Sequence, residues 1–234
     1  PVLHDFCNGV VDAAEKSVTE AGLTISCKAG CGACCRQLVP ISETEARQIA
    51  RLVAELPEPR RSEIRQRFAE AKQQLQANGM WETLSARDTW DEAAGIQAVG
   101  LEYFHLGIAC PFLEQESCSI HLQRPLTCRE YLVTSPAEHC QQPSAQRIQQ
   151  VPIPLKTWTA LARMTPAAAE AKYIRWVPLI MSLDWSAQHP DEPPPQPGPL
   201  LLREFIEIAV GKRGQIPEPP LGAGTGPSSG RGTS

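Results

Sequence analysis

Four cysteines fall within nine residues of this chain, and they constrain its fold more than any other feature. The segment reads Cys27-Lys-Ala-Gly-Cys31-Gly-Ala-Cys34-Cys35, and its two glycines allow the backbone to fold tightly and bring the sulfurs together. A disulfide between the adjacent Cys34 and Cys35 would close a strained ring, and the short spacing restricts the other pairings. This density favours thiolate ligands for a metal over disulfides.

Four more cysteines follow at wider spacing, which implies ligands carried on loops. They are Cys110, Cys118, Cys128 and Cys140. Along the chain the eight form two groups of four, which we interpret as two halves of one assembly. Adjacent side chains of an extended segment point in opposite directions, so Cys34 and Cys35 can each face a different centre. Eight thiolates would complete two four-sulfur sites, and we expect all eight to bind metal.

The ninth cysteine and two histidines are weaker candidates. Cys7 is isolated on an apolar helical stretch, so we expect a small buried hydrophobic side chain rather than a ligand. His121 and His139 lie close to Cys118 and Cys140 along the chain, and imidazole is a good ligand for zinc and iron. Either histidine could therefore replace a thiolate at one of the centres.

Clustered thiolates repel one another, so their ligation requires a cation that lowers their pKa. Folding should then depend on metal, and the metal-free form should be loosened. Arg36, Arg124 and Arg129 stand beside ligand cysteines, where their charge and N–H donors could offset the negative charge of the thiolates. The alternative is that these are ordinary surface arginines.

Helical periodicity predicts helices in the first part of the chain. Apolar residues recur every three to four positions over residues 2–20, which predicts a helix there. Ser42 and Glu45 have the spacing of a capping box, which predicts a second helix from there to Leu56. Two prolines then break the chain, so the next helix should form a hairpin with this one.

The third predicted helix stops around Asn78-Gly79 and carries one apolar stripe. We interpret its arginines as a solvated face. They are Arg60, Arg61, Arg65 and Arg67. Residues 80–109 mix bulky aromatic residues with glycines, so we expect short helices and loops packed on the metal core.

A further helix is predicted after the last cysteine. Thr165-Pro166 reads as an N-cap followed by proline in the first helical position, with Tyr173, Ile174 and Val177 as the apolar face. Proline at the next position should kink or end this helix. Together these patterns predict a mainly α-helical fold, with little strand, built around irregular cysteine-rich loops.

The clearest boundary in the chain is a proline-rich stretch from Gln188 to Pro199, which favours an extended, solvated linker. A short amphipathic helix over residues 201–209 and a disordered Gly/Pro/Ser tail should follow it. We therefore expect a metal-binding domain over residues 1–187, with its motif core at residues 23–140. Residues 188–234 would form a separate C-terminal region.

Composition narrows the function classes. The 234 residues carry a net charge of −4 with no basic stripe, so nucleic acid is not an expected partner. No run approaches the roughly 20 apolar residues of a membrane span, and the first residues do not resemble a secretory signal. We expect a soluble, cytoplasmic protein without a membrane partner.

The ordered motifs resemble those of the YkgJ-like cysteine cluster family. The resemblance covers residues 23–140 and rests on Cys-x3-Cys-x2-Cys-Cys, followed by Cys-Pro-Phe-Leu, Cys-x-Ile-His, Arg-Pro and Cys-Arg-x-Tyr. It implies a zinc- or iron-chelating domain whose ligands match the cysteines named above, with Cys140 in a more variable position. His121 stands where this family usually has tyrosine. A flagellin lysine methylase is similar in its cysteine cluster, which makes methyl transfer conceivable.

The leading interpretation is a metal-binding protein that holds zinc or iron through eight thiolates. One alternative is an iron–sulfur protein with a redox role or a role related to methyl transfer, in which the same cysteines hold a cluster. Another is an interaction module that recruits a protein partner through residues 188–210. A disulfide-rich scaffold fits the cysteine density least. No phosphate loop or nucleophile motif supports hydrolysis.

Overall fold

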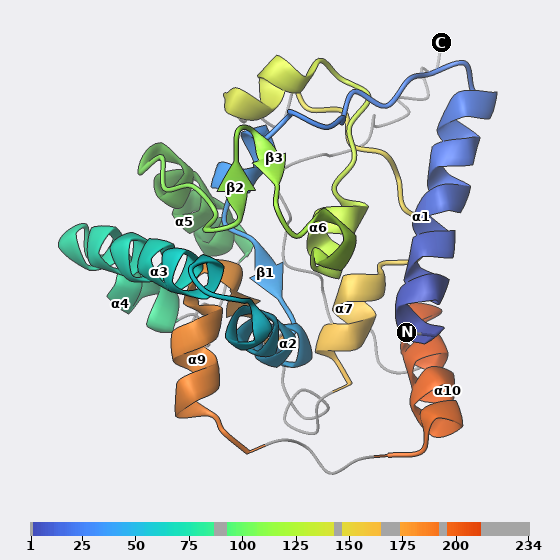
Figure 1. The fold of residues 1–234 in the computed structure, drawn as a ribbon. Coiled ribbons are helices and arrows are strands. Elements are labelled where there is room, and N and C mark those ends of the chain that lie inside the picture. The colour runs from blue at the N-terminus through green and yellow to red at the C-terminus, as the bar shows by residue number, and fades with distance from the viewer. Residues whose placement is uncertain (1, 87–92, 143–146, 165–173, 192–195, 212–234) are drawn as a thin grey trace.

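The computed structural model describes residues 2–86, 93–142, 147–164, 174–191 and 196–211. Helices dominate this part of the chain, and two short two-stranded sheets lie among them (Figure 1). The mainly α-helical fold predicted from the sequence is confirmed. No helix in the described part of the chain has the length and apolarity needed to cross a membrane.

Helix α1, Val2–Glu20, stands along one side of the molecule (Figure 1). Its buried face consists of side chains three to four positions apart. They are Cys7, Val10, Val11, Ala14 and Val18. Gly22 follows the helix with a φ of 72°, a left-handed conformation that glycine adopts without strain. The predicted helix over residues 2–20 and the burial of Cys7, which is 1% exposed, are both confirmed.

Helix α2, Glu43–Glu55, begins at the predicted capping box. The Ser42 hydroxyl accepts a hydrogen bond from the Glu45 amide at 3.2 Å, and the Glu45 carboxylate accepts one from the Ser42 amide at 2.9 Å. These bonds satisfy two donors that the first turn of a helix otherwise leaves free. Ile49 and Val53 bury the apolar face of this helix in the main core.

Helix α3, Arg60–Ala77, packs beside α2 and ends as predicted, with Asn78 at its C-cap and Gly79 in a left-handed conformation. Ile64, Phe68, Ala71 and Leu75 are all buried along one stripe. Helix α4, Met80–Ser85, and helix α5, Ala93–His105, follow. The short helices expected between residues 80 and 109 are thus present; residues 87–92 lie outside the described residues.

Strand β1, Pro40–Ile41, pairs antiparallel with strand β4, Val177–Pro178. The predicted helix after Thr165 is therefore wrong at its end: residues 165–173 lie outside the described residues, residues 174–176 are irregular, and Val177 is in a strand. The β-branched Val177 pairs with Ile41 and is fully buried, so tertiary packing outweighs the local helical pattern.

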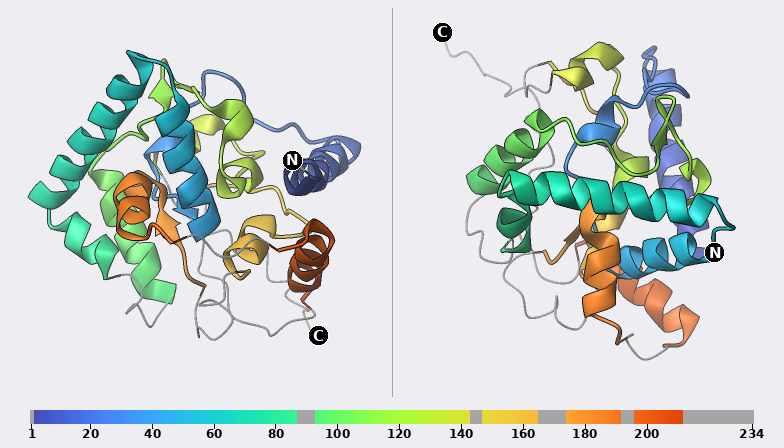
Figure 2. Two further views of the ribbon diagram at one scale, coloured as in Figure 1. Left: turned by 60° about the horizontal axis from the view of Figure 1, so that its bottom comes forward. Right: turned by 60° about the vertical axis from the view of Figure 1, so that its left-hand side comes forward.

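The C-terminal part of the described chain folds back onto the body. In chain order it comprises helix α7, Thr157–Ala162; the 3-10 helix η5, Leu179–Met181; helix α9, Ser182–Gln188; and helix α10, Gly198–Ala209. Helix α10 lies against α1 and α7 (Figures 1 and 2). Phe205 is fully buried, and its ring meets that of Phe6 edge to face at 6.0 Å. The predicted amphipathic helix is confirmed, and it docks on the body.

Only part of the predicted linker between α9 and α10 lies within the described residues. Residues 189–191 and 196–197 are irregular and exposed, in keeping with an extended, solvated segment. Residues 192–195 and the predicted disordered tail over residues 212–234 lie outside the described residues.

Candidate metal centre

One cavity of about 1030 Å³ brings together all eight cysteines predicted as ligands. They are Cys27, Cys31, Cys34, Cys35, Cys110, Cys118, Cys128 and Cys140. The other cysteine, Cys7, is buried in a different cluster with Trp158 and Phe205. All nine cysteines are free thiols. Segments whose nearest cysteines, Cys35 and Cys110, are 75 positions apart therefore contribute thiols to a single site.

The first cysteine loop turns tightly into the 3-10 helix η1, Ala33–Arg36, which carries Cys34 and Cys35. The extended segment assumed for this pair from the sequence is therefore wrong, and adjacent side chains of a 3-10 helix point about 120° apart rather than in opposite directions. Gly32 precedes it and lies against the hairpin of strands β2, Leu113–Glu114, and β3, Ser117–Cys118. A Cβ atom on Gly32 would stand 2.5 Å from the Leu113 side chain and 2.7 Å from that of Glu116. An added Cβ would therefore displace the ends of both side chains, and the Glu116 Cα, 3.2 Å away, leaves little further room, so glycine suits the close approach to the hairpin.

The β2–β3 hairpin ties the first loop to the second half of the site. Arg36 donates hydrogen bonds to both carboxylate oxygens of Glu116, and the Gly30 amide donates one to the Ser117 hydroxyl at 3.1 Å. The Cys110 amide donates to the Cys35 carbonyl at 2.8 Å. Gln115 and Glu116 form the turn with φ values of 47° and 57°, the twist that tight hairpins need.

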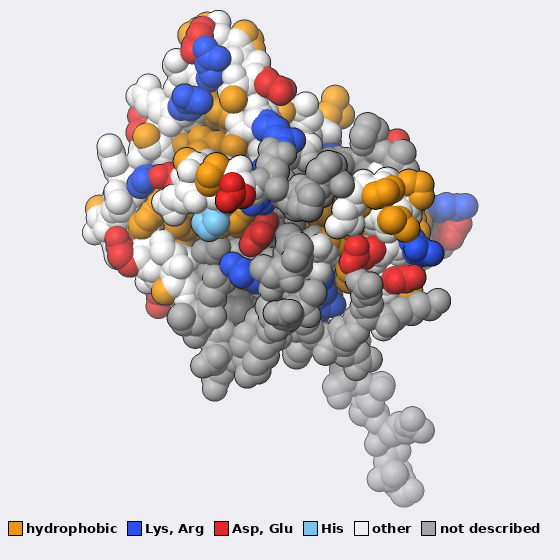
Figure 3. Space-filling view, turned by 90° about the horizontal axis from the view of Figure 1, so that it is seen from below, with side chains coloured by type: hydrophobic (Ala, Val, Ile, Leu, Met, Phe, Trp, Pro, Cys, Tyr) orange, Lys and Arg blue, Asp and Glu red, His pale blue; other side chains and the backbone are white. Residues whose placement is uncertain are grey.

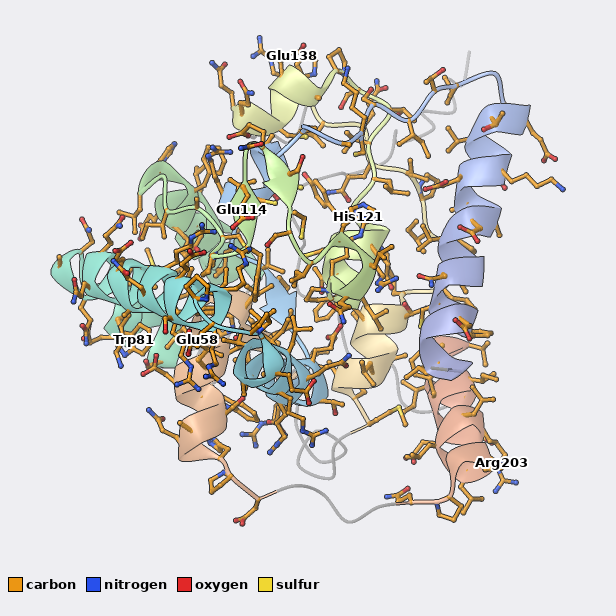
Figure 4. The ribbon with its side chains drawn as sticks, viewed as in Figure 1. Glu58, Trp81, Glu114, His121, Glu138 and Arg203 are labelled. Carbon is orange, nitrogen blue, oxygen red and sulfur yellow. The ribbon has the colours of Figure 1, made fainter. Side chains whose placement is uncertain are left out.

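The hairpin is in turn held by helix α3, which corrects the sequence interpretation of its arginines. Glu114 lies on β2 (Figure 4), where Arg60 and Arg67 both donate hydrogen bonds to its carboxylate. Arg60, and next Arg67, lowers the pKa of this carboxyl below its usual value. Two of the four arginines are therefore not a simple solvated face; Arg65, by contrast, is exposed.

Cys128 sits on the short helix α6, Leu126–Glu130, which two buried carboxylates hold in place. Glu45 accepts a hydrogen bond from the Leu126 amide at 2.7 Å, so the same side chain caps α2 and the start of α6. Glu130 accepts from the Thr157 hydroxyl at 2.5 Å and from the Trp158 amide at 2.9 Å. Burial raises the pKa of both carboxyls.

The three arginines predicted to offset thiolate charge have different roles. Arg36 pairs with Glu116, and Arg129 donates to Asn8 and to two backbone carbonyls, so both hold the fold together. Arg124 alone lines the cavity. Its charge lies near the thiols of Cys27, Cys34 and Cys118 and favours their ionised form.

The two histidines also differ. His121, in the 3-10 helix η3, His121–Gln123, lines the cavity and lies just above α6 in Figure 4. The nearby charge of Arg124, with a smaller contribution from burial, lowers its pKa, which keeps the imidazole neutral and able to bind a metal. His139 instead places its Nδ1 2.9 Å from the Arg147 carbonyl and is not among the cavity-lining residues.

Sequence reasoning missed Tyr131 and the buried carboxylates as parts of the site. Tyr131 lines the cavity, and its hydroxyl hydrogen-bonds the Cys140 thiol and accepts from the Gln37 side chain at 3.4 Å. The Cys-Arg-x-Tyr motif contained this residue, but its spacing does not show that the tyrosine reaches a cysteine farther along the chain. Glu45 was recognised only as a helix cap.

Burial is the main electrostatic feature of the thiols. It raises the pKa of Cys110 to about 12 and that of Cys140 to about 11, and it raises that of Cys128 as well. A hydrogen bond with Cys35, and then burial, raises the pKa of Cys34. Neighbouring cysteines add to each of these shifts. A cation within the cavity would reverse them, because it favours the ionised form of every thiol around it.

The eight thiols suit a thiophilic metal. The distances between them decide whether a single zinc ion or a larger centre fits. Eight thiols line the cavity, and thiolates are the ligands of structural zinc sites and of iron–sulfur clusters. Within the described residues, however, no three side chains of His, Cys, Asp or Glu converge where one ion could bind them all. A single zinc ion, with Zn–S bonds of about 2.3 Å, would require the loops to close further.

Comparison with known proteins gives one match. The model of the family CxxCxxCC, described as "Putative zinc- or iron-chelating domain", matches residues 26–147, which include every cysteine of the cavity. No curated protein and no solved structure matches the chain.

Proposed function

Since the chain belongs to the CxxCxxCC family of zinc- or iron-chelating domains, we propose that it binds zinc or iron through eight of its nine cysteines. The observation that carries this proposal is the position of the cysteines in the fold. Residues from four separate segments bring eight thiols to one cavity, while Cys7 packs in the apolar core. Chance burial of cysteines would not select the eight that match the motif.

The surrounding residues have defined tasks in such a centre. Arg124 offsets part of the negative charge of the thiolates, and Tyr131 donates to the Cys140 sulfur. The pairs Arg36–Glu116 and Glu45–Leu126 hold the loops that carry the ligands. The metal would supply the positive charge that keeps the thiolates ionised and the loops closed.

An iron–sulfur centre is the second candidate, and the spacing of the thiols favours it. Each thiolate of a cluster binds a different iron, so the sulfurs stand around a volume rather than at one point. The cavity has that form: eight thiols line about 1030 Å³, and no three potential ligands of the described residues converge on one position. This supports a role in electron transfer, redox sensing or cluster-based catalysis; methyl transfer, the alternative that rests on the resemblance to a flagellin lysine methylase, belongs to the last of these.

Two further expectations stay proposals. Nine free thiols suit a reducing compartment such as the cytoplasm. A protein partner at residues 188–210 would have to bind the apolar side chains that α10 leaves exposed, namely Leu200, Ile206 and Val210. Hydrophobic side chains gather at the right of Figure 3, on the side where α10 lies in Figure 1.

Elemental analysis tests the proposed function. Iron, zinc and acid-labile sulfide are measured on protein purified without oxygen, together with its visible spectrum. We expect metal in wild-type protein, unchanged content in Cys7→Ser, and reduced content in Cys128→Ser. Iron with sulfide and a broad visible absorption supports the cluster; zinc without colour supports closed thiolate sites. Protein that holds neither metal, before and after anaerobic reconstitution, contradicts the proposal.

A further inference from the structure

The eight cysteines are grouped differently in space than along the chain. We propose that they form two metal centres, each with ligands from both sequence groups. This inference rests on the proposed function. Cys27, Cys31 and Cys140 belong to the first centre. Cys110, Cys118 and Cys128 belong to the second. The adjacent pair Cys34 and Cys35 lies between them and gives one thiol to each.

Packing places Cys140 with the first loop. Cys140 is 3% exposed and belongs to a small apolar cluster with Ala33 and Val133, against which Cys27 and Cys31 also pack. The cysteines near enough to raise the pKa of Cys140 are Cys27, Cys34 and Cys31, all from the first loop. Cys140 is thus the last cysteine of the second sequence group but lies with the first group in space.

The backbone explains this crossing. After α6 the chain runs back along the first cysteine loop, where the Ser26 amide donates to the Val133 carbonyl at 2.9 Å and the Ser26 hydroxyl donates to the Thr134 carbonyl at 3.3 Å. The 3-10 helix η4, Ala137–Gln141, then packs on η1. Cys140 in η4 is therefore carried to the helix that holds Cys34 and Cys35.

The other three cysteines form a second neighbourhood. The main cysteine neighbours of Cys128 are Cys110, Cys34 and Cys118, and those of Cys110 are Cys118 and Cys34. Cys110 and Cys118 pack against the main core, which includes Phe112. The hairpin brings them together, because Cys118 is in register with Leu113, three residues after Cys110.

The Cys34–Cys35 pair joins the two neighbourhoods. The two thiols share a hydrogen bond, and Cys34 lies near enough to raise the pKa of Cys27 and Cys140 on one side and of Cys128 on the other. One thiol from this pair brings each group of three to the four ligands that zinc sites and four-cysteine clusters use. The two centres would therefore be neighbours within one cavity.

Metal content of paired variants tests this assignment. Each of Cys27→Ser, Cys128→Ser and Cys140→Ser should lose about half of the bound metal, the share of one centre in two. Cys27→Ser/Cys140→Ser should lose no more than either single variant, because both changes affect one centre. Cys128→Ser/Cys140→Ser should lose nearly all of it. Cys7→Ser is the matched control and should bind metal as wild type does.

The opposite pattern overturns the assignment. If Cys128→Ser/Cys140→Ser keeps as much metal as its single variants while Cys27→Ser/Cys140→Ser loses nearly all of it, the ligands group in chain order. Loss of all metal from each single variant would show one shared centre and would also overturn it. Wild-type protein without metal would overturn both this assignment and the proposed function, whereas the other outcomes leave the proposed function intact.

A measurement on wild-type protein avoids variants that fail to fold. Metal-loaded protein is treated with a chelator and pulsed with an alkylating reagent, and mass spectrometry follows each cysteine. Cys140 should be labelled at the rate of Cys27 and Cys31, and Cys128 at the different rate of Cys110 and Cys118. Labelling of Cys140 together with Cys128, or of all eight at one rate, would contradict two centres with crossed ligands.

Discussion

Arg36 and Glu116 join the two cysteine regions through a bidentate ion pair, with N–O distances of 3.0 and 2.6 Å between residues 80 positions apart. The pair fixes η1, with Cys34 and Cys35, to the turn of the hairpin that carries Cys118. A planar guanidinium matches a carboxylate in orientation as well as charge, so this pair sets the geometry of the site as well as its stability.

Glu116→Gln should therefore speed the loss of metal. The substitution keeps the shape of the side chain but removes the charge that holds Arg36, so the first loop moves more freely. We expect faster transfer of metal to a chelator at low ionic strength, and a smaller difference from wild type in high salt, which screens the exposed pair. Glu58→Gln is the control, since it breaks an ion pair with Arg61 on α3. Equal release rates for both variants would contradict this role.

Gly32→Ala should disrupt the site without touching a ligand. The added methyl group would meet the Leu113 side chain and the Glu116 carboxylate at 2.5 and 2.7 Å, so the leucine must shift and the carboxylate must move from its position on Arg36. We expect lower metal content and a lower melting temperature. Gly9→Ala in α1 is the matched control, because a Cβ there meets nothing within 4 Å, and it should stabilise the helix by roughly 0.5–1 kcal/mol. Wild-type metal content in Gly32→Ala would contradict the steric argument.

Metal binding should release protons. The buried thiols of Cys110 and Cys140 have pKa values raised to about 12 and about 11, so both are protonated in the metal-free protein at neutral pH. A bound metal needs thiolates, so apparent affinity should fall as pH falls, by about tenfold per pH unit for each proton released. Calorimetric titration in buffers of different ionisation enthalpy measures this number. Binding heats independent of buffer would show that the thiols are already ionised.

The metal-free protein should lose stability in alkali. Folding raises the pKa of these same thiols above their ordinary value of 9.0, so the folded state holds protons that the unfolded chain gives up. Their contribution is complete below pH 9 and disappears as pH rises toward about 11 to 12. Urea unfolding between pH 8 and 10.5, with and without metal, tests this. Metal-free stability that rises over this range would contradict the sign.

Phe205→Ala should destabilise the whole protein, because α10 is part of the body. Phe205 is fully buried against Phe6 and the core around Trp158, so its truncation should cost about 3–5 kcal/mol. Ile206→Ala, on the adjacent exposed position, should change the free energy of unfolding by less than about 0.5 kcal/mol. Urea titration compares the two. A Phe205 variant as stable as wild type would mean that α10 docks only weakly.

Local sequence patterns predicted the parts of the fold that local chemistry determines. Helices α1, α2 and α3 follow from their apolar stripes and from the Ser42 capping box, because each signal lies within a few residues of the element that it specifies. The strand at Val177 could not be predicted in this way. Its partner, Ile41, is more than a hundred residues away, and pairing with it decides the conformation.

The site shows the same division. Dense spacing identified the four thiols of the first loop, since that spacing itself brings sulfurs together, and the wider-spaced second group was predicted to complete the site; all eight line the cavity. Which thiols become neighbours depends on how η4 returns to η1, and that is a property of the tertiary fold. The ion pairs of Arg60 and Arg67 could not be predicted from local sequence either, because both side chains meet Glu114 only once the hairpin has packed on α3.

The pairing of Pro40 with Pro178 also has a consequence for synthesis of the protein. Strand β1 follows directly after the first cysteine loop, and the Val39 carbonyl accepts a hydrogen bond from the Leu179 amide at 2.9 Å. All eight cysteines leave the ribosome before residue 177 does, so the strand that completes this region arrives after every thiol has been made. We therefore expect the thiols to stand in a partly assembled pocket during translation, open to oxidants and to metal. The order of synthesis thus allows metal to enter the loops before the β1–β4 pair forms.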